Sequence, residues 1–498
     1  MSEREIKLHV EPDRRDRLLD ALGRRRMRRS ALSAVYFDTP DGLLARHRFA
    51  LRLRQEDGRW VQALKGATGR ADERSEHEVV VETPGGAVPP LDIDRHRQTG
   101  VGRRLRTLLK KHGRPPLDES CRTEVTRQSR LLHAHGAVVE WALDEGEITS
   151  GSRSQPISEL ELELKDGDAA GLYAVAHDWE ALHGLWIDPV SKSERGALLQ
   201  DDAAYRAPTR AGPVPWSAKQ ARLMDGATML RRMVAACLAQ IVPNAGEIAR
   251  GSRDPEHVHQ LRVGLRRLRS AAQAMKPFAA GLPAGWEAAL RPAFDALGEA
   301  RDRHVLATSL LPRLRAAGAA VVDAGGPSEE EQARHLQHLV RGATLQGLLL
   351  RLLAFAEVPA DAADRPDGKA GAGLERVVSR LRKLARQATR DARRFQALSF
   401  ERQHQVRKRL KRLRYLAEFA APAFDRDAVR RWFDKVAPAQ DALGKHIDLV
   451  LAGRRFAGRA PADPDAAFAA GWLRAKSERS AQAARRSLQR LRDVDAFW

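Results

Sequence analysis

The 498-residue sequence predicts a multidomain chain in which an antiparallel β domain with a few helices (α+β) precedes an all-α domain. Residues 1–205 hold many segments in which apolar and charged residues alternate, which is the period of a half-buried β-strand. From Ala221 onward, apolar residues recur with the 3.6-residue period of helices. Residues 206–219 contain prolines and follow neither period. We therefore expect domains at 1–205 and 220–498, joined by a linker at 206–219.

The strands of the first domain carry unusual charges. In the opening stretch SEREIKLHV, one face holds Glu3, Glu5 and Lys7, and the other face is apolar. In SELELELK, Glu159, Glu161 and Glu163 likewise oppose three leucines. We expect short turns at residues 56–58 and 144–146, and helices over residues 94–112 and 171–183.

These charged faces allow two interpretations. They are either solvated outer faces or the wall of a polar lumen, because alternate residues of every strand point inward in a closed antiparallel barrel. Further alternating segments place bases on one face, including LRLR at Leu51, ALKG at Ala63 and RSEHE at Arg74. Carboxylates suit divalent cations, and arginine and lysine suit phosphates. A lumen with both would suit a metal-complexed triphosphate.

These segments resemble the CYTH superfamily of triphosphate tunnel metalloenzymes over about residues 3–200. Glu3-x-Glu5-x-Lys7 matches its ExExK signature, and YFDTPDGLL, LRLR, ALKG, RSEHE, TRQ, ALDEG, ELELEL and SKSERG follow in family order. The resemblance implies an eight-stranded antiparallel β-tunnel barrel that binds Mg²⁺ or Mn²⁺. It implies that the metal ligands are Glu3, Glu5, Asp144, Glu159, Glu161 and Glu163. It implies that the substrate-binding residues are Lys7, Arg52, Arg54, Lys65, Arg74, Arg127 and Lys192. We take Glu3, Glu5 and Lys7 as the catalytic set.

The helical part contains an internal repeat. HQLRVGLRRLR begins at His259 and HQVRKRLKRLR at His404, while LGEARDRHVLA begins at Leu297 and LGKHIDLVLA at Leu443. The repeat predicts a duplicated bundle of about four helices per copy. On a helix, each copy carries a basic stripe along one face. The stripes consist of His259, Arg262, Arg266 and Arg269, and of His404, Arg407, Lys411 and Arg414.

A basic stripe by itself is usually a solvated helix face, and either histidine could serve a structural hydrogen bond. Two stripes in the same register favour an extended polyanion as partner. Residues 1–210 carry equal numbers of basic and acidic residues, so the whole net charge of +21 lies in residues 211–498. Aromatic residues make up only 5% of the chain and none interleaves in the first stripe, which disfavours nucleic acid.

The second domain resembles the CHAD family, the conserved-histidine α-helical domain, through HxxRVxxRRLR at His259 and LGEARDRHV at Leu297. The resemblance implies two pseudo-symmetric four-helix bundles that bind inorganic polyphosphate. Asp302 and Asp448 are equivalent in the two copies, but Ile447 stands where the first copy has Arg301. We assign the binding role to the His/Arg helices rather than to the aspartates.

Remaining features set the context. No stretch approaches the roughly 20 apolar residues of a membrane-spanning helix, the N-terminus lacks an apolar signal, and Cys121 and Cys237 form no metal-binding pattern. We expect a cytoplasmic protein, including association with polyphosphate granules, with no membrane partner. The predicted function is a metal-dependent inorganic triphosphatase with a polyphosphate-binding module. The alternatives are a non-catalytic polyphosphate-binding protein, a thiamine triphosphatase, an adenylate cyclase and a nucleic-acid-binding protein.

Overall fold

The computed structural model describes residues 2–23, 27–67, 73–82, 88–319, 326–357, 369–461, 463–491 and 494–498; for residues 2, 3, 67, 73 and 74 it describes the backbone alone. The chain forms two compact units. The first unit takes the chain up to Thr209, with Leu238–Ser252 and Gln337–Val358; the second takes Arg210–Cys237, Arg253–Leu336 and Pro359–Trp498. The units therefore do not follow a single cut in the sequence, and the domain boundaries at 205 and 220 stay a prediction.

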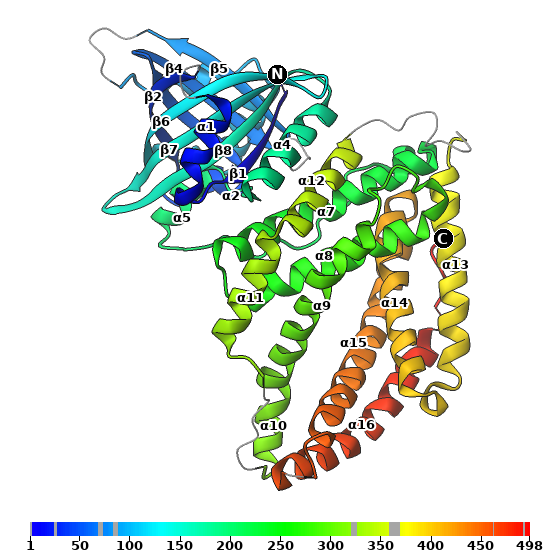
Figure 1. Ribbon diagram of the computed structural model, residues 1–498. Coiled ribbons are helices and arrows are strands. Elements are labelled where there is room, and N and C mark those ends of the chain that lie inside the picture. Colours follow the sequence, from blue (N-terminus) through cyan, green and yellow to red (C-terminus); the bar gives the residue numbers. More distant parts are fainter. Residues whose placement is uncertain are drawn as a thin grey trace. The chain divides into compact units, whose positions relative to one another are not determined.

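The first unit is built on one antiparallel sheet of nine strands, ordered β5-β4-β3-β2-β6-β7-β8-β1-β9 (Figure 1). β1 pairs with β8 along much of its length and also with β5 through three residue pairs at its N-terminal end, so the run of paired neighbours returns to β5. The strands are β1 (Ser2–His9), β2 (Arg28–Asp38), β3 (Phe49–Glu56), β4 (Arg59–Ala67), β5 (Glu73–Val81), β6 (Asp118–Ala134), β7 (Ala137–Ser150), β8 (Arg153–Gly167) and β9 (Trp186–Ile187).

The predicted antiparallel sheet is confirmed, with two differences. The short strand β9 makes nine strands where eight were expected. The expected turn at residues 144–146 is wrong, because β7 continues through it and pairs with both neighbours. The reason is Gly146, whose missing side chain lets β6 approach: a Cβ there would lie 1.9 Å from the carbonyl oxygen of Glu124. The turn between β3 and β4 is confirmed, with Asp57 and Gly58 at φ values of 48° and 82°.

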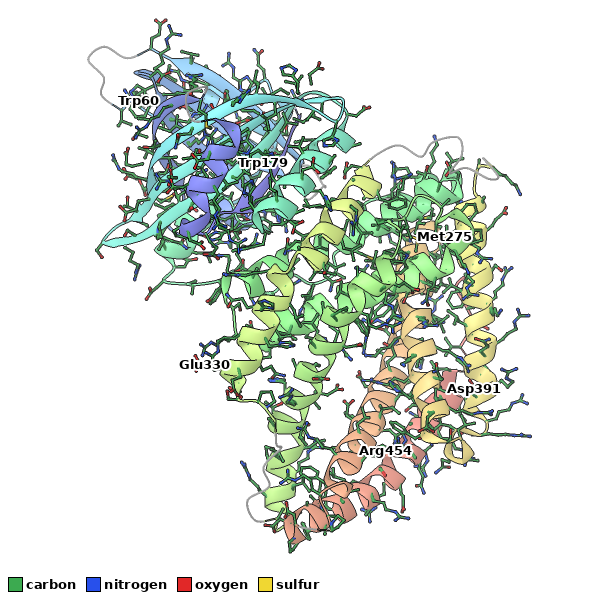
Figure 2. All side chains as sticks on the ribbon, viewed as in Figure 1. Trp60, Trp179, Met275, Glu330, Asp391 and Arg454 are labelled. Atoms are coloured by element: carbon green, nitrogen blue, oxygen red, sulfur yellow. The ribbon has the colours of Figure 1, made fainter. Side chains whose placement is uncertain are left out.

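Helices cover the outer faces of this sheet. α4 (Ala169–His183) contacts β1, β7 and β8, and its Trp179, labelled in Figure 2, lies 5.4 Å from the ring of Trp141 on β7. α12 (Ala343–Glu357) packs on α4. The expected helix over residues 171–183 is confirmed, and that over 94–112 is resolved into a 3₁₀ turn (Ile93–His96) and α3. The other helices are α1 (Arg15–Leu22), α2 (Leu43–Arg46), α3 (Gly100–Lys111) and α5 (Lys192–Gln200).

The second unit is all-helical, as predicted. α8 contacts α9 and α14, α14 also contacts α13 and α15, and α15 runs beside α16 (Figure 1). Its helices are α6 (Ala218–Leu223), α8 (Pro255–Ala274), α9 (Trp286–Val305), α10 (Leu311–Ala316), α13 (Ala372–Ala392), α14 (Phe400–Ala420), α15 (Arg426–Ala457) and α16 (Pro464–Arg490), with a π-helical turn at Leu306–Leu310. α7 (Gly226–Arg250) and α11 (Glu329–Arg341) are divided between the units.

Side-chain caps fix the start of the helices that carry the basic stripes. Asp254 accepts a hydrogen bond from the backbone N–H of Glu256 at the start of α8, and Pro255 occupies the first helical position. Ser399 caps α14 in the same way through the N–H of Arg402. Among the described residues no single helix is both long and apolar enough to cross a bilayer; α11 and α12 reach that length and composition only as a pair bent by 47°.

Candidate active site and anion-binding stripe

Charged side chains from several strands line one cavity of about 220 Å³ in the first unit. Because side chains alternate between the two faces of a strand, Glu5 on β1, Asp144 on β7 and Glu161 on β8 all point into this cavity. The opening sequence stretch predicts this position for Glu5. β3 and β4 contribute bases to the same cavity. The predicted residues that line it are Glu5, Lys7, Arg52, Arg54, Lys65, Arg127, Asp144, Glu161, Glu163 and Lys192. The charged faces of these strands are therefore interior, not solvated.

Three carboxylates form a cluster at one side of the cavity. Asp144, Glu159 and Glu161 each place an oxygen within 4.8 Å of the others. The cluster follows from register, because Asp144 on β7 stands opposite Glu159 on β8, and Glu161 is the next residue on the same face. The side chains of Asp144 and Glu159 are fully buried. Buried carboxylates this close repel one another unless cations compensate them.

Two basic residues supply that compensation. The ammonium group of Lys192 donates to Asp144, Glu159 and Glu161 at 2.6, 2.5 and 2.9 Å. Arg127 donates to both oxygens of Asp144 at 2.7 Å and also contacts Glu161. Burial alone would raise the pKa of Glu161, but the neighbouring cations, Lys192 first, hold it well below its usual value. The same contacts hold the pKa of Lys192 well above its usual value although burial opposes this.

Helix α5 puts Lys192 in this position. Ser191 and Glu194 form a capping box in which each side chain bonds the backbone N–H of the other residue, so Lys192 is the first residue of the helix. Further along, Gly196 rests directly on Cys121: a Cβ at this glycine would lie 2.0 Å from the Cys121 sulfur. The cap and this close approach fix α5 against the sheet, and with it the ammonium group among the carboxylates.

The donor set fits a divalent cation. Carboxylate oxygens are the ligands that Mg²⁺ and Mn²⁺ prefer, and the cluster offers three of them. Glu5 lines the same cavity, and Lys7 lies 3.4 Å from Glu5 and 3.3 Å from Glu161. A cation here would share or replace the contacts that Lys192 makes with the three acids.

The bases of β3 and β4 bring several positive charges close together on the other side of the cavity. Arg52 and burial together lower the pKa of Arg54 from its usual value, because two guanidinium groups crowd one another there. Acids partly offset this, since Glu76 lies 3.2 Å from Lys65 and Glu78 lies 3.5 Å from Arg54. A phosphate chain that contacts these bases would reduce their mutual repulsion.

The predicted site residues Glu3, Arg74 and Glu163 are not placed in the acid cluster or on the basic side of the cavity. The side chains of Glu3 and Arg74 lie outside the described residues, although their backbones pair between β1 and β5. Glu163 lines the cavity but lies outside the three-acid cluster and pairs with Lys165 at 2.7 Å.

The structure also adds residues to the site. Glu76 and Glu78, which the alternation in RSEHE placed on the face of Arg74 without a role, line the cavity. Arg195 is buried and lies 2.9 Å from Glu159 and 2.8 Å from Asp188; its signal was its place in SKSERG. It gives Glu159 a second cationic neighbour.

In the second unit, the two predicted basic stripes come together because α8 packs against α14. Burial and the cations around them lower the pKa of His259 and of His404 to about 4, so both imidazoles are neutral. Burial first, and then the charges of Arg262 and Arg407, lower the pKa of Arg266 to about 10. The pKa of Lys411 lies well below its usual value, through burial and then through the same arginines.

These lowered pKa values indicate that the two stripes carry more positive charge than the nearby acids neutralise. Acids approach the stripes mainly in the second copy, where Asp448 lies 3.5 Å from Arg407 and Glu418 lies 3.2 Å from Arg414. In the first copy Glu287 lies 4.0 Å from Arg269, at one end of the stripe, and Asp302 opposes the effect of burial on the pKa of Arg262. An anion laid across α8 and α14 would relieve this repulsion.

Comparison with known proteins finds two family domains in the chain. A family model of the CYTH domain matches residues 1–197, and one of the CHAD domain matches residues 232–457. An inorganic triphosphatase of Haemophilus influenzae is 29% identical over 174 residues, which cover 34% of this chain and 46% of that protein. The alignment thus spans less than half of that relative's length. An uncharacterised protein of Mycobacterium tuberculosis is 28% identical over 459 residues, covering 84% of this chain and 80% of the relative.

Solved structures include the CHAD domain of Ricinus communis, with 28% identity and a TM-score of 0.43, covering 57% of this chain and 96% of that one. A second, from Hippeastrum and described as an adenylyl cyclase with a dominant triphosphatase activity, has 20% identity and a TM-score of 0.29, covering 40% and 96%. Both family matches confirm the resemblance that the motifs indicated. The chain therefore contains a CYTH domain at residues 1–197 and a CHAD domain at residues 232–457.

Proposed function

We propose that the first unit hydrolyses inorganic triphosphate to diphosphate and phosphate with the help of Mg²⁺ or Mn²⁺. One observation carries this proposal: a single cavity holds a carboxylate cluster and a set of arginines and lysines. A triphosphate with its cation needs both kinds of group. The similarity to an inorganic triphosphatase supports the same class of reaction.

The acids and bases would divide the work. Asp144, Glu159 and Glu161 would hold the divalent cation, which when bound supplies charge neutralisation along the phosphate chain. Arg127 keeps Asp144 in place through two hydrogen bonds of 2.7 Å. The preorganised carboxylates need no rearrangement to meet a cation, apart from the displacement of Lys192.

Bases on β3 and β4 would bind and orient the phosphates. Arg52 and Arg54 can form paired hydrogen bonds to phosphate oxygens, and Lys65 adds a point charge. The described lining of the cavity contains no histidine or cysteine. This favours direct attack by water over a covalent intermediate on those residues.

The test is phosphate release from inorganic triphosphate, with ATP and thiamine triphosphate in parallel, under Mg²⁺ and under Mn²⁺. We expect metal-dependent turnover that prefers inorganic triphosphate, and a fall of at least about 100-fold in Glu161→Gln. The matched control is Glu147→Gln, the same change on the exposed face of β7. Full metal-dependent turnover in Glu161→Gln would reject the assignment of this cluster.

We also propose that the helical unit binds inorganic polyphosphate along the α8–α14 stripes. The support is the charge that these helices concentrate without matching acids, which lowers the pKa of Arg262, Arg266 and Lys411. Histidines that stay neutral near pH 7 can add hydrogen bonds but no charge.

This second proposal is tested by binding of labelled polyphosphate and of double-stranded DNA at several salt concentrations. We expect preference for polyphosphate, and a smaller salt slope in Arg262→Gln and Arg266→Gln by about one ion for each lost charge. Equal affinity for DNA would favour a nucleic-acid-binding protein instead.

A further inference from the structure

The second repeated motif, LG followed four residues later by Asp, has no role in the function proposed so far. In the first copy it lies on α9, where Phe294, Gly298 and Asp302 are spaced by four residues and so share one helix face. α9 packs against α8, the helix that carries the first basic stripe. The face of α9 that holds the motif therefore meets the row of arginines.

One aromatic ring serves three arginines at this contact. The guanidinium carbons of Arg262, Arg266 and Arg269 lie 5.7, 5.7 and 5.2 Å from the ring centroid of Phe294. Cations within about 6 Å of a ring centroid are attracted by its quadrupole. The ring is uncharged, so it holds the guanidinium groups in a row without neutralising them.

The glycine of the motif makes room for the first of these groups. A Cβ at Gly298 would lie 3.2 Å from the Nη2 atom of Arg262, which is closer than an ordinary contact. The three atoms nearest to that position all belong to the Arg262 guanidinium group. The Nε atom of Arg262 is buried and has no hydrogen-bond partner among the described residues, so the guanidinium keeps donor capacity for a ligand.

The second copy holds its arginines differently. The position equivalent to Phe294 is Gln440, which accepts a hydrogen bond from Arg414 at 3.1 Å and donates one to the carbonyl of Leu410 at 3.0 Å. Arg414 also contacts Glu418, and Arg407 contacts Asp448. Acids thus offset part of the charge in the second copy, whereas in the first copy a ring carries most of the positioning.

We propose that Phe294 and Gly298 are positioning residues for the polyphosphate site: together they align Arg262, Arg266 and Arg269 as one guanidinium row that acids compensate only in part, which makes the first copy the primary anchor for the chain of phosphates. The inference rests on the proposed binding of polyphosphate by this unit. It also assigns the preference for phosphate to a row of planar groups with a fixed spacing of one helical turn.

The experiment measures binding of labelled polyphosphate to the full chain as a function of salt, alongside thermal melting. We expect Phe294→Leu to weaken binding by about fivefold with an unchanged salt slope, because every charge remains. Phe294→Tyr keeps the ring and should bind like the wild type. Phe468→Leu, at an exposed phenylalanine of α16, is the matched control.

Gly298→Ala separates positioning from folding. Alanine favours a helix over glycine, so the melting temperature should rise, while the added methyl group displaces Arg262 and weakens binding by about twofold or more. If Gly298 had only a structural role, the melting temperature and the affinity for polyphosphate would change in the same direction. Gln440→Leu should weaken binding less than Phe294→Leu.

The outcomes distinguish the inference from the function beneath it. If Arg262→Gln weakens binding but Phe294→Leu and Gly298→Ala do not, the positioning role is overturned and polyphosphate binding stands. If Phe294→Tyr loses as much affinity as Phe294→Leu, the ring's attraction for the guanidinium groups is overturned. If the wild type binds no polyphosphate, the proposed function fails and the inference fails with it.

Discussion

Replacing Glu180 by glutamine should remove a pH dependence of stability in the first unit. Glu180 lies on α4 with 1% of its surface exposed, and neither carboxylate oxygen has a hydrogen-bond partner among the described residues. α12 packs against it so closely that a Cβ at Gly347 would lie 3.3 Å from one of these oxygens. Burial raises the pKa of Glu180 to about 7, although Arg351 acts in the opposite direction.

The magnitude follows from the two states of the carboxyl group. Its ordinary pKa is 4.5 and its pKa in the folded chain is about 7, a difference worth about 3 kcal/mol. Between these values the folded chain binds a proton that the unfolded chain has lost, so stability falls as pH rises through this window. The loss is complete above pH 7. Below pH 4.5 both states are protonated and the group contributes no pH dependence.

The assay is urea unfolding of the wild type and Glu180→Gln at pH 5, 6, 7 and 8. The wild type should lose about 2.5 kcal/mol more than the variant between pH 5 and pH 8, because glutamine carries no charge. Glu147→Gln removes an exposed carboxylate and should leave the pH dependence unchanged. An identical slope in the wild type and Glu180→Gln would refute the reasoning that the buried carboxyl stays unpaired.

Two further predictions concern α5 and the carboxylate cluster. Lys192→Met should destabilise the first unit by about 3–5 kcal/mol in the presence of a chelator, because it removes the ammonium group that contacts all three buried carboxylates. Mg²⁺ or Mn²⁺ should restore part of this stability in thermal melts. No rescue by either metal would argue against a cation site. Gly196→Ala should lower stability by about 1–3 kcal/mol, since its methyl group would overlap the Cys121 sulfur, and unchanged melting would mean that α5 can move away from the sheet.

Much of the first unit could be predicted because a strand fixes the direction of every second side chain. The alternation at Glu5 and Lys7 correctly placed both in the interior. The turn prediction failed at Gly146, where an Asp-Glu-Gly sequence that is typical of a turn lies inside a long strand. There the deciding factor is the close approach of β6, which no local pattern records.

Contacts between distant segments could not be predicted from the sequence. The low aromatic content suggested that the basic stripe lacks aromatic neighbours, yet Phe294 reaches three of its arginines from the next helix. Similarly, Lys192 was expected on the phosphate side but contacts the carboxylate cluster. Both placements depend on how separate elements pack, whereas periodicity describes one element at a time.

The two units hold their positive charge under different physical constraints. In the cavity, groups such as Lys192 and Arg127 are removed from water, so each must have acids within ion-pair distance for the sheet to be stable. On the helical unit, Arg262 and Arg266 are half-buried with few acids beside them, so their pKa values fall and salt ions or a bound anion must moderate their repulsion. This difference accounts for the balanced charge of residues 1–210 and for the net charge of +21 in the rest of the chain. It follows that added salt should weaken polyphosphate binding by the helices far more than it weakens the ion pairs inside the cavity.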